Sequence, residues 1–125
     1  MKKIGTLSTR IEKILHLNDI KDRNIYLGES NIVHMQKAHP KDYEKYKDEL
    51  SNILAFPDYV GINKKDLSIE YVKEFVIDNE FVKVAVRVSG NEKLFARSMY
   101  VLNNKRVQNF IEKKALLAVD MENDL

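Results

Sequence analysis

Two stretches of the chain carry side chains that could transfer protons or bind anions. The first holds His34 and His39, and the second holds Lys83, Arg87 and Arg97. Imidazole is the side chain best suited to accept and donate protons near neutral pH, and lysine and arginine stabilise negative charge. This combination suits acid–base chemistry on an anionic substrate.

Several classes of site find no support in the sequence. The chain contains no cysteine, which excludes disulfides, thiolate zinc sites and cysteine nucleophiles. His34 and His39 are five residues apart, so they do not align on a helix as the two histidines of a zinc protease do. No glycine-rich phosphate loop, G-x-S-x-G turn or paired-carboxylate motif is present. We therefore expect neither a metal nor a cofactor.

The positive charge of the chain is concentrated in one region. The net charge is only +2, but residues 83–114 contain eight basic and two acidic residues. With 44% hydrophobic and 32% charged residues, the 125-residue chain can form a packed core and has too many ionic groups for a membrane span. Because the N-terminus lacks the apolar stretch of a secretory signal, we expect a cytoplasmic protein without membrane association.

The first half of the chain has helical patterns. Thr9 and Glu12 form a capping box before a short helix, and residues 25–27 fit a short strand. A second helix is expected to begin with Ser30 as its N-cap and to end near His39, because Pro40 disfavours a helical residue before it. A third helix over 41–55 should direct these apolar or aromatic side chains inward: Tyr43, Tyr46, Leu50, Ile53 and Leu54.

The second half has the alternation of half-buried strands over 68–77, 81–89 and 94–102, with an earlier strand at 59–62. Asp78-Asn79 and Gly90-Asn91 suit two-residue hairpin turns. A last helix from about Asn104 includes Ala118 on its inner face. We predict an α+β domain: N-terminal helices packed on one side of a three- to four-stranded antiparallel sheet, with a C-terminal helix.

Two-residue turns would fix the pairing of the strands. They place Glu70 opposite Arg87, Glu74 opposite Lys83, Lys83 opposite Ser98, and Phe81 opposite Tyr100. One face then carries Glu70, Val72, Glu74, Lys83, Ala85, Arg87, Ala96, Ser98 and Tyr100. The core face carries Tyr71, Phe75, Val82, Val84, Val86, Val88, Phe95, Met99 and Val101. The first face is either a shallow floor where an anion meets Lys83 and Arg87, or a solvated surface with ordinary cross-strand ion pairs.

Two residues leave alternatives open. Arg97 falls on the core side opposite Val84, so it lies at the sheet margin, pairs with a buried acceptor or marks a bulge that turns it outward. His39 shares a helix face with Ile32 and Met35 and should point inward, towards the sheet margin. There it is either a general base or a capping histidine satisfied by the backbone, whereas His34 lies on a different side of the helix.

A substrate that brings its own charge and nucleophile fits these residues. In RNA the 2′-hydroxyl attacks the adjacent phosphodiester when a base removes its proton, cations stabilise the phosphorane, and an acid protonates the leaving 5′-oxygen. RNA is therefore the expected partner of an enzyme of this kind.

The order of short motifs resembles that of a known family. The segments are Ile25-Tyr26-Leu27, Asn31 to Met35, Lys37-Ala38-His39-Pro40, Asn52-Ile53-Leu54, Pro57-Asp58-Tyr59-Val60-Gly61, Val84 to Val88, and Arg97 to Leu102. Over about residues 25–114 they look like the phage-borne branch of the barnase–EndoU–colicin–RelE-like (BECR) nucleases. The resemblance implies N-terminal helices followed by a four-stranded antiparallel sheet, and a single domain over 1–125. Within it, 1–24 would be a helical lead-in, 25–118 the nuclease core and 119–125 a frayed tail.

The resemblance also implies a function and roles for residues. It implies a metal-independent endoribonuclease of a phage or mobile element that acts as a toxin, with a cognate antitoxin or immunity protein as a second partner. By position, His39 would be the base or acid, Arg97 and Arg87 the phosphate-binding cations, and Ser98 and Tyr100 the hydroxyl partners. Lys83 and His34 would assist substrate binding. The alternative is a non-enzymatic protein that binds nucleic acid or a host protein through its basic face; the oligomeric state stays open.

Overall fold

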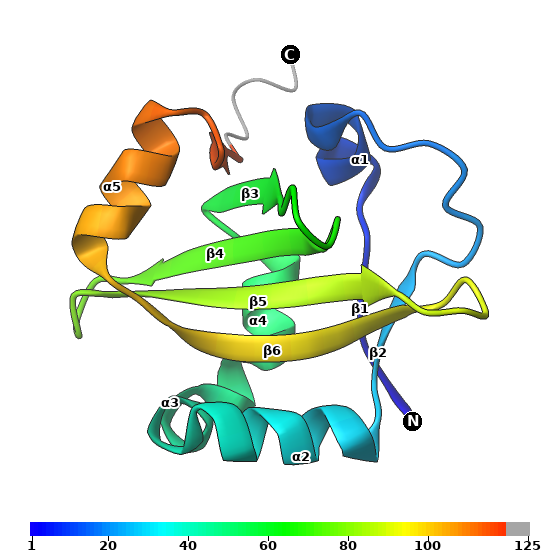
Figure 1. The fold of residues 1–125 in the computed structure, drawn as a ribbon, viewed down its shortest axis with the longest axis horizontal. Coiled ribbons are helices and arrows are strands. Elements are labelled where there is room, and N and C mark those ends of the chain that lie inside the picture. Colours follow the sequence, from blue (N-terminus) through cyan, green and yellow to red (C-terminus); the bar gives the residue numbers. More distant parts are fainter. Residues whose placement is uncertain (120–125) are drawn as a thin grey trace.

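A computed structural model describes residues 1–119 of the chain and contains one mixed sheet with helices on both of its faces (Figure 1). The strands are β1 (Lys2–Thr6), β2 (Asn24–Leu27), β3 (Tyr59–Ile62), β4 (Ile69–Phe75), β5 (Glu80–Val88), β6 (Leu94–Leu102) and β7 (Leu117–Ala118). The helices are α1 (Thr9–Leu15), α2 (Glu29–Ala38), α3 (Pro40–Tyr46), α4 (Leu50–Ala55) and α5 (Asn104–Glu112), with a 3-10 turn η1 (Lys47–Glu49).

The α+β class is confirmed, but the sheet is larger than predicted. It has seven strands in the order β1-β2-β6-β5-β4-β3-β7, not three or four. β2 joins β6 in parallel, and β1 adds an antiparallel edge strand inside the segment 1–24 that was expected to be helical. β1 lies close to α4 because Gly5 has no side chain: a Cβ there would be 3.3 Å from Leu54. Such long-range pairing leaves no local pattern in the sequence.

Helices cover both faces of the sheet, which corrects the expectation of helices on one side only. The main core joins one face, including Tyr71, Val84 and Met99, to side chains of α1 to α4. On the opposite face a smaller cluster joins Val72, Phe81 and Leu102 to Val107 of α5 and to Leu116. Figure 1 shows α4 behind the sheet, α2 and α3 along its lower edge, and α5 at the upper left. The second face is therefore covered at one end only.

The first two helices begin one and two residues earlier than predicted. Ser8, not Thr9, caps α1 by accepting a hydrogen bond from the Ile11 amide. Gly28, not Ser30, is the N-cap of α2, and the Asn31 side chain accepts a hydrogen bond from the Gly28 amide. The expected helix over 41–55 consists of α3, η1 and α4, and its five predicted inward residues are all buried.

The hairpin turns are longer than predicted, so the strand pairing shifts. Residues 76–79 join β4 to β5, and residues 89–93 join β5 to β6. The predicted partners are therefore wrong. Glu70 lies opposite Ala85, Glu74 opposite Phe81, Lys83 opposite Tyr100, and Phe81 opposite Leu102. Because the shift is by two positions, the β4 and β5 side chains keep the faces that the alternation predicted.

The C-terminal helix also ends earlier than expected. α5 stops at Glu112, and Ala118 belongs to β7, which pairs with β3. A Cβ at Gly61 of β3 would lie only 2.2 Å from the Ala115 carbonyl oxygen, so the returning chain needs a glycine there. The Val119 amide donates a hydrogen bond to the Asp58 carbonyl; the rest of the expected frayed tail lies outside the described residues.

Candidate functional site

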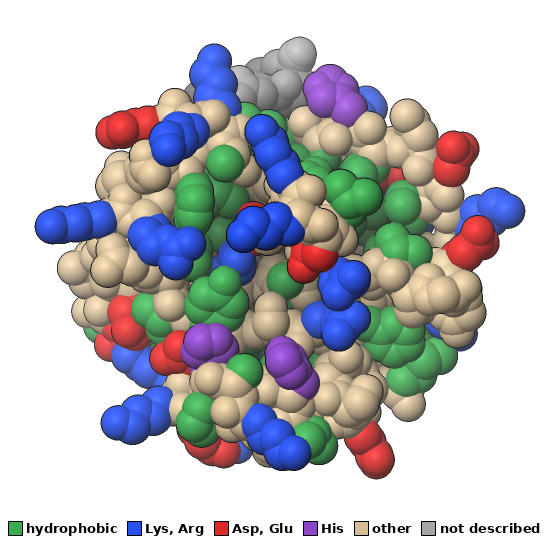
Figure 2. All heavy atoms as spheres, in the orientation of Figure 1, with side chains coloured by type: hydrophobic (Ala, Val, Ile, Leu, Met, Phe, Trp, Pro, Cys, Tyr) green, Lys and Arg blue, Asp and Glu red, His purple; other side chains and the backbone are tan. Residues whose placement is uncertain are grey.

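The sheet face that α5 leaves uncovered is the candidate site. We call it the open face, and it consists of Glu70 on β4, Lys83, Ala85 and Arg87 on β5, and Phe95, Arg97, Ser98 and Tyr100 on β6. Figure 2 views the molecule onto this side and shows Lys and Arg side chains around a hollow, with histidine side chains at its lower rim. Lys83 and Arg87 both lie on this face as predicted, and Lys83 also forms an ion pair with Glu70, a feature of the alternative interpretation.

A β-bulge brings Arg97 to the open face. The pairing of β5 with β6 shifts between Ala85–Ser98 and Val86–Ala96, which leaves Arg97 as the extra residue. Arg97 is exposed, whereas Ala96 is fully buried in the core. Of the three explanations for Arg97, the bulge is therefore the one observed. It also reverses the predicted faces of Phe95 and Ala96.

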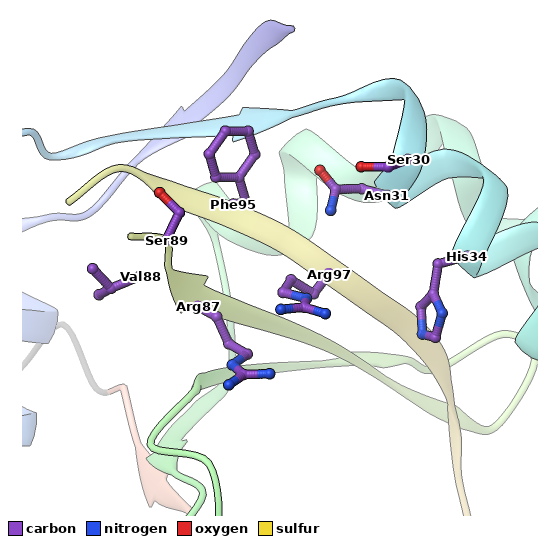
Figure 3. Close-up of a pocket in the computed structure, with 8 residues that line it drawn as sticks. All are labelled: Ser30, Asn31, His34, Arg87, Val88, Ser89, Phe95 and Arg97. Carbon is purple, nitrogen blue, oxygen red and sulfur yellow. The ribbon is translucent and has the colours of Figure 1, made fainter. Parts of the chain in front are cut away.

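Arg87 and Arg97 line a pocket together with His34. The cavity is about 370 Å³ in volume and contains no acidic side chain; its remaining lining residues are Ser30, Asn31, Val88, Ser89 and Phe95. Figure 3 shows the two guanidinium groups on the same side of the sheet and the His34 ring beside them, extending from α2. No carboxylate lines the cavity, although Asp66 outside it interacts electrostatically with Arg87. Two guanidinium groups in one cavity suit an anionic group such as a phosphate.

His39 lies further along β6, against Tyr100. The two rings stack with their centroids 4.6 Å apart and an angle of 22° between the ring planes. His39 is the last residue before Pro40 begins α3, and Asp42 in the first turn of α3 accepts a hydrogen bond from the Val101 amide at 3.0 Å. This bond holds the junction of α2 and α3 at the edge of β6. His39 is exposed, so the expected inward direction is wrong, although its position at the sheet margin is confirmed.

Lys83 completes this part of the face. Its Nζ lies 4.8 Å from the centroid of the Tyr100 ring and 2.7 Å from Oε2 of Glu70, and both charged side chains are largely buried. Burial alone would lower the pKa of Lys83, but the hydrogen bond with Glu70 and the interaction with Tyr100 outweigh it and raise the pKa above its ordinary value. Lys83 therefore remains a cation on the floor of the site.

The structure groups the predicted residues into two sets. His34, Arg87 and Arg97 share one pocket, and His39, Tyr100 and Lys83 form a stacked cluster. The Ala85–Ser98 pair lies between the sets. Strict alternation would put Arg97 and Ser98 on opposite faces of the sheet. Because of the bulge, the half-buried Ser98 is on the same face as Arg97.

Sequence reasoning missed part of the lining. Ser30 was interpreted as a helix cap, and Phe95 as a core residue; both line the pocket. The cap is formed by the Gly28–Asn31 pair instead, and this G-x-x-N spacing is the local signal that was available. The position of Phe95 depends on the bulge, for which an arginine out of phase was the only sign.

Residues 1–119 contain no cluster of three or more His, Asp or Glu side chains that could hold a metal ion. In the same part of the chain, no helix is long and apolar enough to cross a membrane.

Of three comparisons with known proteins, the one with protein-family models found a match. The family model for the phage-Barnase-EndoU-ColicinE5/D-RelE like nuclease3 matches residues 2–109, most of the chain. No match was found among curated proteins or among solved structures. The matched region includes all of the strands and helices that form the open face. The chain thus belongs to this family of phage BECR-like nucleases.

Proposed function

We propose that the protein is a metal-independent endoribonuclease that cleaves RNA by 2′-hydroxyl attack, with the open face as its active site. Membership of a nuclease family supports a nucleic-acid substrate. The observation that carries the proposal is the placement of an imidazole, His39, on the same β6 edge as a pocket lined by Arg87 and Arg97. A proton-transfer group and phosphate-binding cations are what this chemistry requires.

The strand geometry supports the binding of one phosphate by these groups together. Tyr100, beneath His39, and Phe95, in the arginine pocket, flank Arg97 and Ser98 on β6. Two residues along a strand span roughly 7 Å, so a phosphate above Ser98 lies between the imidazole and the guanidinium groups. The small Ala85 and Ser98 side chains leave room for it.

The proposed reaction uses each group in turn. His39 acts as base or acid: a base takes the proton of the 2′-hydroxyl, the 2′-oxygen bonds to phosphorus, and the bond from phosphorus to the 5′-oxygen breaks as an acid protonates that oxygen. Arg87 and Arg97 stabilise the charge of the phosphorane, and Lys83 adds to the positive field. The Ser98 and Tyr100 hydroxyls donate hydrogen bonds. The products are a 2′,3′-cyclic phosphate and a 5′-hydroxyl.

Cleavage of single-stranded and structured RNAs in the presence of EDTA tests the proposal. We expect cyclic phosphate ends by mass spectrometry, and a loss of at least about 100-fold in rate for His39→Ala and for Arg97→Ala, as is usual when a proton-transfer or charge-stabilising group is removed. Lys37→Ala, an exposed cation on the same helix, is the matched control and should cleave normally. Intact tRNA, rRNA and mRNA after incubation with the folded wild type would refute the proposal.

One observation favours a second candidate, a protein that binds RNA without cutting it. The His39 ring is held by stacking, and within residues 1–119 no side-chain hydrogen bond orients it, whereas a general base is usually oriented by a third group. A binding protein would show salt-sensitive association without products. Lys83→Glu or Arg87→Glu would then abolish binding, and His39→Ala would be harmless.

A further inference from the structure

A second groove adjoins the arginine pocket on the open face, between the sheet and α5. We call it the α5 groove. Its volume is about 710 Å³, against about 370 Å³ for the arginine pocket. Six of its lining residues are cations, namely Lys64, Lys65, Lys83, Arg106, Lys113 and Lys114. Apart from Lys83 and Tyr100, its lining residues have no role in the proposed reaction.

Most cations that line the α5 groove have no acidic partner among its lining residues. Glu70 is its one acidic lining residue, and that carboxylate is bonded to Lys83. Within residues 1–119, the other five cations have no carboxylate in ion-pair distance. Five like charges around one concavity repel each other and raise the local concentration of anions. A polyanion would relieve this repulsion.

The groove also offers aromatic surface next to its cations. The Arg106 guanidinium lies 5.6 Å from the centroid of the half-buried Phe110 ring, and Lys83 lies beside Tyr100 in the same groove. Rings interleaved with cations are the pattern on which unpaired nucleic-acid bases stack while phosphates bind alongside. A duplex cannot present its bases in this way.

The α5 groove and the arginine pocket are neighbours along β5 and β6. Lys83 and Tyr100 belong to the groove, Arg87 and Phe95 belong to the pocket, and only the Ala85–Ser98 pair separates them. Lys83 and Arg87 are four residues apart on β5, a distance of roughly 13 Å along an extended strand. One nucleic-acid strand can therefore occupy both.

The far wall of the groove is built by chain that follows the family-matched residues. Lys113, Lys114 and residues 115–117 come after residue 109, where the family match ends. Their position is fixed by the close approach of Ala115 to Gly61. This wall therefore lies outside the family-matched residues and packs closely against β3.

We propose that the α5 groove binds single-stranded RNA that flanks the cleaved bond, with the phosphates on its lysines and a base on Phe110. That this bond is cleaved on the open face rests on the proposed function. The concave shape and the aromatic rings favour RNA over an acidic protein surface, which would need cations alone.

Binding of a short single-stranded 2′-O-methyl RNA tests the groove separately from catalysis, because this probe lacks the attacking hydroxyl. Fluorescence anisotropy would give the affinity between 50 and 200 mM salt. For Lys64→Ala/Lys113→Ala the slope of log K against log salt should become shallower by about 1.4, the contribution of two phosphate contacts on a single strand. The control Lys3→Ala/Lys37→Ala removes two exposed cations outside the groove and should keep the wild-type slope.

Cleavage provides the second arm. The variant Lys64→Ala/Lys113→Ala should cut a dinucleotide as fast as the wild type does. It should lose the increase in kcat/KM that the wild type shows with a longer strand. A wild type that binds the probe yet never cuts RNA would refute the nuclease and leave the groove assignment standing. An unchanged salt slope in the folded double variant, equal affinity for a hairpin duplex, or equal displacement by polyglutamate would each overturn the groove assignment, the last in favour of an acidic protein partner.

Discussion

Replacing Glu70 with glutamine should make the protein less stable and a better binder of RNA at the same time. Glu70 and Lys83 form the most buried ion pair among residues 1–119, with side chains 14% and 12% exposed and a bond of 2.7 Å. The carboxylate supports the fold by pairing a buried ammonium group, but it also neutralises a cation on the open face. Glutamine keeps the shape and one acceptor oxygen while removing the charge.

The size of the stability change follows from the bond that is weakened. A hydrogen bond between charged groups contributes about 1.5–3 kcal/mol, and a neutral acceptor retains part of it, so we expect a loss of about 1–2 kcal/mol. For a chain of 125 residues, each kcal/mol lowers Tm by about 4 °C, which gives a decrease of about 4–8 °C. The pKa of Lys83 is raised in the folded state, so the pair's contribution is complete below about pH 10 and is lost as pH rises through the folded-state pKa. The difference in stability should accordingly narrow in strong alkali.

The binding change has the opposite sign. With Glu70 neutral, Lys83 is available to one additional phosphate, so affinity for single-stranded 2′-O-methyl RNA should rise and the salt slope should steepen by about 0.7. Thermal unfolding and anisotropy on the same preparations measure both effects. Glu74→Gln, an exposed carboxylate on the same face of β4, is the matched control and should change neither by a comparable amount. A variant that loses stability without gaining affinity would show that Lys83 does not face the ligand.

Three further substitutions test other contacts. Tyr71→Phe should raise stability by about 1–2 kcal/mol, and Tm by about 4–8 °C, because within residues 1–119 the buried Tyr71 hydroxyl has no hydrogen-bond partner; a lower Tm would contradict this. Gly61→Ala should cost at least about 2 kcal/mol in urea unfolding, because its Cβ would lie 2.2 Å from the Ala115 carbonyl, whereas Gly90→Ala, with open space around it, should lose far less; equal losses would refute the close approach. Glu80→Gln should cost about 0.5–1 kcal/mol at neutral pH. The hydrogen bond from Lys45, and then the one from Tyr46, lower the pKa of Glu80, so this contribution is present above about pH 4.3 and is lost as pH falls through the folded-state pKa. In urea unfolding, the difference in stability between the two proteins should narrow as pH falls below about 4.3, and a difference that does not narrow would contradict the assignment.

Local signals in the sequence predicted the elements well. Pro40 correctly separates two helices at His39. The alternation of β4 and β5 correctly separates core from open face except at Val88, which was predicted in the core but is exposed and lines the arginine pocket. Both features depend on residues within a few positions of each other. The helix-to-strand order of the main body follows from them.

Long-range pairing and turn length could not be predicted. Val76 and Ile77 look like a continuation of strand β4, yet they lie in the turn, 75% and 100% exposed, and this error moved the hairpin by two residues. β1 has too few apolar residues to show a strand period and is defined only by its partner β2. The α5 groove was missed for a related reason: its cations come from the 63–67 loop, from β5, from α5 and from the two residues that follow α5, which only the folded chain brings together.

The bulge in β6 changes which alternate residues of that strand lie on the open face. Before Arg97 the odd-numbered residues lie on the open face, and after it the even-numbered ones do. Phe95 and Tyr100 therefore lie on the same face of the sheet. Deleting Arg97 would restore one phase throughout and push either Phe95 into the space of the fully buried Ala96 or the distal half out of register. The fold therefore tolerates a substitution at Arg97 far better than a deletion or insertion there. Insertions or deletions in β6 should disrupt both the fold and the candidate site.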